Sequence, residues 1–314
     1  MLYAFAPGEG LVPVERPEDG RGALWFHIEN PSPEEKERMA QLLGIPRTWL
    51  DPTNGRTVYR PSFQASGGSA RLSLAAPFHH RGKDPREEVP YDIIPSGWIY
   101  TGTQLLTWSV DEAGYLHKAA KDPDLEEASL MEILVHALQS LARHYWELLL
   151  EINQQIRVLE RSVLEAQRNP AVQPIMNLNK ALLLFARSLE QNVYAMRRMR
   201  HWLEDRELGP EVEEWDLAED EMEETRDVFR QRNITLASVT KVYTVMIQNN
   251  VNNVMRALTA IIIAAAIPTA VASLWSMNVP LPIEHEPFSF YLLMGISITF
   301  GVILAVRMVR MRVP

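Results

Sequence analysis

The chain has 314 residues, of which 23% are charged, with a formal net charge of −9 at pH 7 and no cysteine. The lack of cysteine excludes disulfides, thiolate metal sites and cysteine nucleophiles. The acidic balance disfavours non-specific binding to nucleic acid, so we expect no nucleic-acid partner. The N-terminal stretch MLYAFAPGEG has no basic segment followed by a long apolar core, so we expect no cleaved signal peptide.

The first part of the chain, residues 1–122, mixes short β-rich runs with turns. A strand is expected to end near Asn30, followed by a helix with Ser32 as its N-cap, Glu35 three residues later and a stop at Gly44. These patterns predict an α+β domain, a sheet with flanking helices. Further β-rich runs, separated by Gly and Pro, are 70–77, 90–96, 97–102 and 104–110.

Three long helices are expected after this domain. Residues 125–169 contain neither Gly nor Pro and repeat apolar residues at helical spacing. Prolines at 170 and 174 end that helix, and a second covers about 175–204. From Glu211 to Ile267 the chain again lacks Gly and Pro, which predicts a long stalk helix whose distal end is also the first membrane helix.

Two apolar runs lie near the C-terminal end of the sequence. Leu258–Trp275 and Phe288–Val306 contain no charge over 18 and 19 residues. As helices they would extend roughly 27–29 Å, close to the ~30 Å hydrocarbon core of a bilayer. The alternative is a buried hairpin in a soluble core, but two spanning-length runs in tandem favour two transmembrane helices.

The flanking charges predict the orientation. Arg256 precedes the first run, and a basic collar of Arg307, Arg310 and Arg312 follows the second, whereas the linker has no Lys or Arg. By the positive-inside rule, both termini are cytoplasmic and the linker is external. We therefore expect a multi-pass protein of the cell (inner or plasma) membrane, in contact with the lipid bilayer.

These patterns give a division of the chain into segments. The expected order is cytoplasmic α+β domain, long-helix region with stalk, first transmembrane helix, external loop, second transmembrane helix and basic tail. Their expected ranges are 1–122, 123–254, 255–277, 278–287, 288–309 and 310–314.

One stripe of the stalk and first membrane helix is a candidate pore lining. Four asparagines fall within residues 249–253, although Asn disfavours helix interiors. A ring of such amides could contact an ion's water shell, and Met255 and Leu258 could form an apolar gate. A register-setting polar layer or ordinary packing would give the same pattern. The stripe is Asn252, Met255, Leu258, Ile262, Ala266, Thr269 and Ser273.

The sequence SMN at residues 276–278, with IPT before it and VPLP after it, resembles the Gly-Met-Asn loop of the CorA family of magnesium channels. NNVNNVMRALT resembles that family's stalk-to-membrane junction, and the likeness covers nearly the whole chain. It implies a homopentamer whose first membrane helix lines a central pore. It also implies a transporter whose cargo is Mg²⁺ or another divalent cation such as Co²⁺ or Ni²⁺. The sequence has no glycine-rich phosphate loop, nucleophile elbow or HExxH motif, so we expect neither an enzyme nor a cofactor.

The resemblance gives the linker a role as selectivity loop. Mg²⁺ gives up its water reluctantly, so a selective entrance holds the hydrated ion through amides and carbonyls. Asn278 would contact the hydrated cation by its amide, and Ser276 and Met277 by their backbone carbonyls. Glu284 and Glu286 would raise the local cation concentration at the external entrance, although an ordinary polar loop would also contain such charges.

Two departures from the family pattern affect these expectations. Ser276 replaces the family's glycine, and serine tolerates positive φ less readily. Lys241 stands where the resemblance would place a carboxylate of a cytoplasmic Mg²⁺ sensor. The acidic run Glu211–Asp227 is expected to be a solvated helix face, or less readily a weak divalent store.

Two other functions stay open. His285, between two glutamates, would suit a transporter of Zn²⁺ or another transition metal on the same scaffold. A non-conducting membrane-anchored oligomeric scaffold is the other alternative.

Overall fold

The computed structural model describes residues 1–20, 22–51, 59–80, 82, 88–166, 172–277, 286 and 288–310. It divides into two compact units, Met1–Leu236 and Ala237–Pro314. The first unit contains both the sheet and the long-helix region. The finer segment boundaries given above remain predictions.

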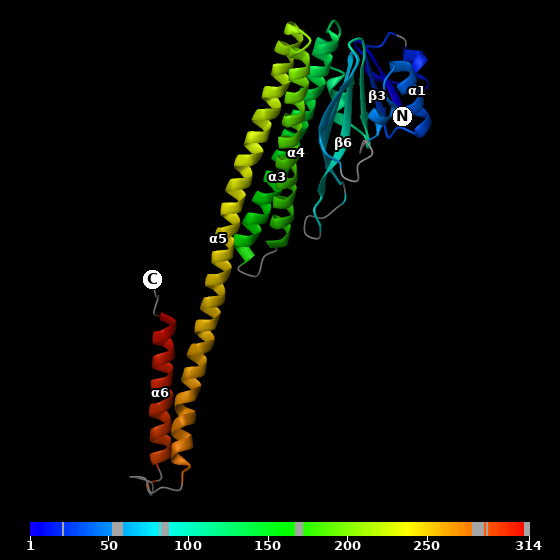
Figure 1. The fold of residues 1–314 in the computed structure, drawn as a ribbon. Helices are drawn as coiled ribbons and strands as arrows, with labels where there is room; N and C mark the ends of the chain where they lie inside the picture. Colours follow the sequence, from blue (N-terminus) through cyan, green and yellow to red (C-terminus); the bar gives the residue numbers. More distant parts are fainter. Residues whose placement is uncertain are drawn as a thin grey trace. The chain divides into compact units, whose positions relative to one another are not determined.

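The first unit is built on one mixed sheet of seven strands in the order β2-β1-β3-β7-β6-β5-β4 (Figure 1). Strands β3 and β7 pair in parallel, and the other pairs are antiparallel. The strands are β1 (Leu2–Ala6), β2 (Gly10–Val14), β3 (Trp25–Glu29), β4 (Ser62–Ser66), β5 (Ser69–His79), β6 (Tyr91–Tyr100) and β7 (Leu105–Ser109).

Helices cover both faces of the sheet, with α1 on one side and α3 and α4 on the other (Figure 1). The α helices are α1 (Pro33–Leu43), α2 (Gly114–Ala119), α3 (Leu130–Ala166), α4 (Val172–Glu204), α5 (Gly209–Trp275) and α6 (Ser289–Arg310). Short 3₁₀ turns lie at Pro17–Gly20, Arg47–Leu50 and Pro123–Leu125. The unit is thus α+β, as the sequence predicted.

Helix α1 begins and ends where its capping residues predict. Ser32 and Glu35 form a reciprocal capping box, and Gly44 ends the helix in the left-handed conformation at φ 62°. Its apolar side, including Met39, packs on the alternate residues of the strands that face it, among them Phe26 and Ile28. This burial forms one of the two cores of the unit.

The other core joins the long helices to β5. The rings of Tyr145 on α3, Phe185 on α4 and Phe229 on α5 meet edge to face, with centroids 5.7–6.1 Å apart. The Asn192 side chain on α4 accepts from Ala75 N at 2.8 Å and donates to Ala75 O at 2.9 Å. The side-chain amide therefore completes the hydrogen bonds of a buried strand position.

One strand prediction is wrong. The runs 90–96 and 97–102 are one strand, β6, which continues through Gly97. The glycine is required because a Cβ there would overlap the Trp108 indole on the neighbouring strand. The sequence patterns also missed the hairpin β1–β2 and the edge strand β4, whose strands have only 5 residues each.

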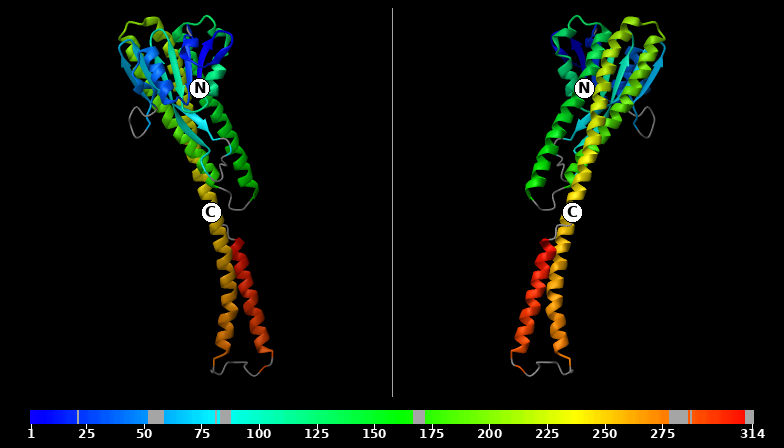
Figure 2. Two further views of the ribbon diagram at one scale, coloured as in Figure 1. Left: turned by 90° about the vertical axis from the view of Figure 1, so that its right-hand side faces the viewer. Right: turned by 90° about the vertical axis from the view of Figure 1, so that its left-hand side faces the viewer.

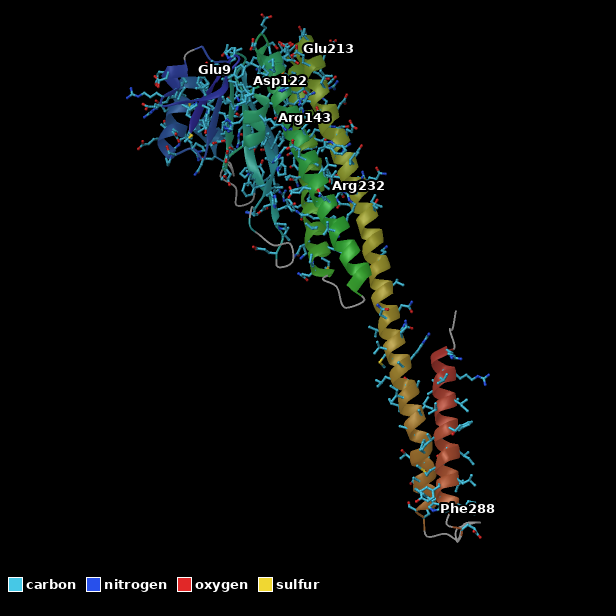
Figure 3. All side chains as sticks on the ribbon, turned by 180° about the vertical axis from the view of Figure 1, so that it is seen from behind. Glu9, Asp122, Arg143, Glu213, Arg232 and Phe288 are labelled. Carbon is cyan, nitrogen blue, oxygen red and sulfur yellow. The ribbon has the colours of Figure 1, made fainter. Side chains whose placement is uncertain are left out.

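The second unit contains the end of α5 and all of α6, which lie side by side in both views of Figure 2. Candidate membrane spans are Gln248–Trp275 and Ser289–Met308. Most of their residues are exposed, which is opposite to the burial expected of a soluble core hairpin. Around these helices Figure 3 shows mostly carbon, whereas around the first unit it shows many side chains that end in nitrogen or oxygen.

Candidate functional site

The candidate pore stripe lies along the face of α5 that α6 does not cover. All seven of its residues are exposed. At 3.6 residues per turn, these positions lie opposite the set that is buried or half-buried. That second, covered set is Ala260, Ile263, Ala264, Ile267, Pro268, Val271, Ala272 and Trp275.

The two helices approach closely at a site made by three residues. Pro268 lies inside α5 and has no N–H, so the carbonyl of Ala264, four residues earlier, loses its helical donor. A Cβ built on Gly301 of α6 would lie 2.8 Å from that carbonyl oxygen. Gly301 therefore lets α6 pack against the freed carbonyl, as small residues do between membrane helices.

Two hydroxyl groups near the end of α5 donate to carbonyls of the same helix. Thr269 Oγ1 donates to the Ala265 carbonyl at 2.8 Å, and Ser276 Oγ donates to the Ser273 carbonyl at 2.9 Å. The second bond satisfies a carbonyl in the last turn, which lacks a helical donor. The hydroxyl donor of Thr269, in the stripe, is therefore satisfied within the helix.

The structure describes part of the predicted selectivity loop. Ser276 and Met277 follow directly after α5, and both are exposed. Positive φ occurs, among the described residues other than glycine, at Asn30 and Glu207, so serine at 276 needs no left-handed conformation. Glu286 is exposed. Asn278 and Glu284 lie outside the described residues.

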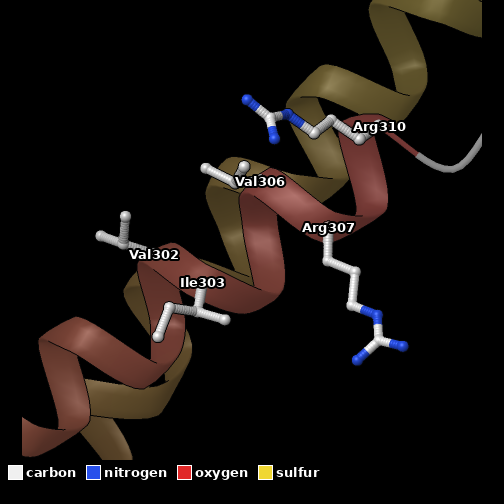
Figure 4. Close-up of a pocket in the computed structure, with 5 residues that line it drawn as sticks. All are labelled: Val302, Ile303, Val306, Arg307 and Arg310. Atoms are coloured by element: carbon white, nitrogen blue, oxygen red, sulfur yellow. The ribbon is translucent and has the colours of Figure 1, made fainter.

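The basic collar is partly described at the end of α6. Arg307 and Arg310 are exposed, and Arg312 lies outside the described residues. Figure 4 shows Arg310 in one row with Val302 and Val306, while Arg307 points to another side of the helix. An open pocket at this end of α6 is lined by Val302, Ile303, Val306, Arg307 and Arg310.

The acidic run of α5 is not a simple solvated face. Arg197 Nε lies 3.4 Å from a Glu219 carboxylate oxygen, and it also pairs with Glu223. Arg200 forms two hydrogen bonds to Asp216. Because these carboxylates join α5 to α4, they are poor candidates for a divalent store.

Glu219 in the acidic run and Lys241 further along α5 both bear on cation binding by the stalk. Burial raises the pKa of Glu219, and the nearby Glu223 charge raises it further. Lys241 is exposed on α5. An ammonium group has no lone pair to offer a cation, so Lys241 cannot replace a sensing carboxylate.

A cluster of two histidines and a glutamate in the first unit was not predicted from the sequence. Atoms of His27, Glu29 and His117 lie within 4.8 Å of one another. The alternation in WFHIE puts the first two on the same side of β3, but nothing local in the sequence connects them to His117.

The fold and the two apolar helices define a membrane protein whose larger unit is an α+β domain with long helices. The family model described as "CorA-like Mg2+ transporter protein" matches residues 20–310. The chain belongs to this family. Its members are ion transporters without a cofactor, and not enzymes.

Individual relatives agree with this assignment. The chain is 26% identical over 196 residues to "Cobalt/magnesium transport protein CorA" of Methanocaldococcus jannaschii, a match covering 59% of this chain and only 60% of that relative. The complete structure of the CorA magnesium transporter from the same organism has a TM-score of 0.71 at 18% identity, covering 98% of this chain and 95% of that one. The full-length CmaX protein has a TM-score of 0.66 at 16% identity, covering 98% and 96%. These structures share the fold.

Proposed function

We propose that this protein is a divalent-cation transporter that conducts hydrated Mg²⁺ through a central pore formed by a homopentamer. The observation that carries the proposal is the free face of α5. Seven polar, apolar and small residues line this face opposite the packing face for α6, which suits a helix that meets its symmetry mates around an axis. Two membrane helices cannot enclose a pathway alone, so the pore requires several copies.

In this proposal the stripe has three parts. Asn252 holds the ion's water shell at the cytoplasmic mouth, and Met255 and Leu258 form an apolar constriction that closes by excluding water. The small and hydroxylated residues Ala266, Thr269 and Ser273 line the outer half. Asn278 is the amide of the external selectivity loop, and Glu286 concentrates cations outside it.

The absence of cysteine from the chain allows a direct test. Ala266→Cys and Ile267→Cys place a thiol at adjacent positions, one on the free face and one on the face toward α6. In liposomes with Mg²⁺, Co²⁺, Ni²⁺ and Zn²⁺ presented separately, we expect Mg²⁺ flux in both variants. A cationic thiol reagent should block flux through the first variant and spare the second.

Other outcomes separate the alternatives. Equal block of both variants, or none in either, would remove the stripe from the pore. Flux of Zn²⁺ without Mg²⁺ would favour the transition-metal transporter. A well-folded oligomer with no flux of any ion would favour the scaffold. Asn278→Ala should reduce discrimination among the four ions without dispersing the oligomer.

A further inference from the structure

Two histidines and a glutamate converge on one face of the sheet in the first unit. His27 and Glu29 belong to β3, and His117 lies on α2. Glu29 Oε1 is 3.5 Å from His27 Nε2 and 3.0 Å from His117 Nε2. Adjacent ligands around a tetrahedral ion with bonds near 2.1 Å lie about 3.4 Å apart, so these separations approach coordination distances.

The buried histidine has a ring nitrogen without a hydrogen-bond partner. The His27 side chain is fully buried, and its Nε2 has no hydrogen bond. Such a nitrogen is costly in a protein interior unless something else uses it. A cation bound between this atom and the neighbouring carboxylate would satisfy both.

Hydrogen bonds around His27 Nδ1 indicate which ring nitrogen carries the proton. Thr107 Oγ1 accepts from Trp25 Nε1 at 2.9 Å and donates to the Phe26 carbonyl at 3.4 Å. Its remaining lone pair faces His27 Nδ1 at 2.8 Å. We therefore assign the proton to Nδ1, which leaves the Nε2 lone pair directed toward Glu29.

The carboxylate is held in place in the same way. Ala113 N donates to Glu29 Oε1 at 3.1 Å, and the Tyr3 hydroxyl donates to Oε2 at 3.3 Å. The Tyr3 ring meets the His117 ring edge to face at 4.6 Å. Outer hydrogen bonds of this kind orient metal ligands and are usual around metal sites.

One side of the cluster is accessible from outside the protein. The His117 side chain is 25% exposed, which leaves a side open to solvent.

We propose that His27, Glu29 and His117 bind a divalent transition ion of the Zn²⁺, Co²⁺ or Ni²⁺ class. Two imidazoles and one carboxylate favour such ions, whereas Mg²⁺ prefers oxygen ligands and its own water. The three protein ligands leave a position for water. The bound ion joins α2 to β3 and so stabilises the first unit. This site lies in the first unit, and the proposal does not depend on the proposed function.

The test uses the full-length protein in detergent, stripped of metal and titrated with Co²⁺ alone. Bound Co²⁺ should give visible absorption bands with nitrogen ligands, and the melting temperature of the first unit should rise with Co²⁺. His117→Asn should weaken this binding at least about 100-fold, more than the loss of an outer hydrogen bond. A large excess of Mg²⁺ should not displace the ion.

The matched control is another histidine–glutamate pair on the surface. His201 Nδ1 lies 3.0 Å from Glu204 Oε2, and no second imidazole joins them among the described residues. His201→Asn should leave Co²⁺ binding unchanged. If the spectrum and affinity survive His117→Asn, or if His201→Asn reduces them equally, the cluster is only an ion pair and the proposal is wrong.

Two variants at Thr107 test the assigned tautomer. Thr107→Val should lower Co²⁺ affinity about 10–100-fold, and Thr107→Ser should retain it. Equal affinity in the two would contradict the positioning role. The pore variant Ala266→Cys should leave the Co²⁺ spectrum intact. Ion flux therefore tests the transport proposal, and the Co²⁺ spectrum tests the metal site separately.

Discussion

At the scale of single residues, Asn192 shows how a polar side chain can hold a helix on a sheet. Strand β4 pairs with β5 through Ser69–Ser73 and does not reach Ala75. The Ala75 N–H would therefore be buried without a partner, and the Asn192 amide bonds both this N–H and the Ala75 carbonyl, which also accepts from the Tyr145 hydroxyl at 2.8 Å. An amide is the side chain that offers a donor and an acceptor together.

We predict that Asn192→Leu destabilises the first unit by about 1–3 kcal/mol, because leucine leaves the buried Ala75 N–H unpaired, whereas the Ala75 carbonyl still accepts from the Tyr145 hydroxyl. The measurement is urea unfolding of the full-length protein in detergent, followed by tryptophan fluorescence. Tyr194→Leu is the control, since Tyr194 is 66% exposed on the same helix. Equal stability of the two variants would contradict the role of Asn192.

His144 is expected to make the stability of the first unit depend on pH. His144 stacks on Tyr115 with centroids 5.2 Å apart, and burial lowers the pKa of His144 despite the nearby Glu147. An unfolded histidine titrates near 6.5, so below about pH 6.5 the unfolded chain takes up a proton that the folded chain takes up less readily. Stability therefore falls as pH decreases through this range.

His144→Phe keeps an aromatic ring beside Tyr115 but cannot bind a proton. The melting temperature of this variant should fall less steeply between pH 7 and 5 than that of the wild-type protein. Some slope should remain, since burial also lowers the pKa of His136. An identical pH dependence in the variant would contradict this assignment.

The sequence predicts side-chain roles that depend on nearby residues, but not the role of Asn192, which depends on a distant one. The capping box at Ser32 and Glu35 was predicted because its partners are three residues apart. Asn192 and Ala75 are 117 positions apart, and an asparagine within an amphipathic helix has no local sign of a buried partner. The cluster of His27, Glu29 and His117 was missed for the same reason.

At the scale of elements, the contact between α5 and α6 depends on a proline and a glycine in different helices. Pro268 frees the carbonyl of Ala264, and Gly301 is the residue that packs against it. The length of both apolar runs was readable from the sequence, since spanning length leaves a simple compositional pattern. The sequence did not show which glycine of α6 faces α5, because that depends on how both helices are rotated about their axes.

We predict that Gly301→Leu disrupts this helix pair, with a loss of about 1–3 kcal/mol from overpacking. Gly295→Leu is a matched control on the same helix, since a Cβ there meets no atom within 4 Å. Thermal unfolding and proteolysis of the full-length protein in detergent measure the effect. Equal loss in both variants would assign it to helix propensity or detergent contact rather than to the Ala264 carbonyl.

At the scale of the whole molecule, family membership and the candidate spans indicate a membrane transporter, whereas the orientation of the chain rests on charge. Arg256 precedes the apolar part of α5, and Arg307 and Arg310 lie at the end of α6. Glu286 lies in the connection between the helices. Arginine is retained on the cytoplasmic side of membranes, so this distribution favours cytoplasmic termini and an external connection.

The last prediction tests that orientation. Because the chain has no cysteine, Glu286→Cys and Glu213→Cys each introduce a single thiol at an exposed position. A membrane-impermeant thiol reagent applied to intact cells should label the first variant and leave the second unlabelled until the cells are permeabilised. Glu213 is labelled in Figure 3, on α5 in the first unit. The reversed pattern would invert the topology and place the first unit outside. Labelling of both thiols in intact cells would show that α5 and α6 do not separate them across a membrane, and the transport proposal would then lose its pathway.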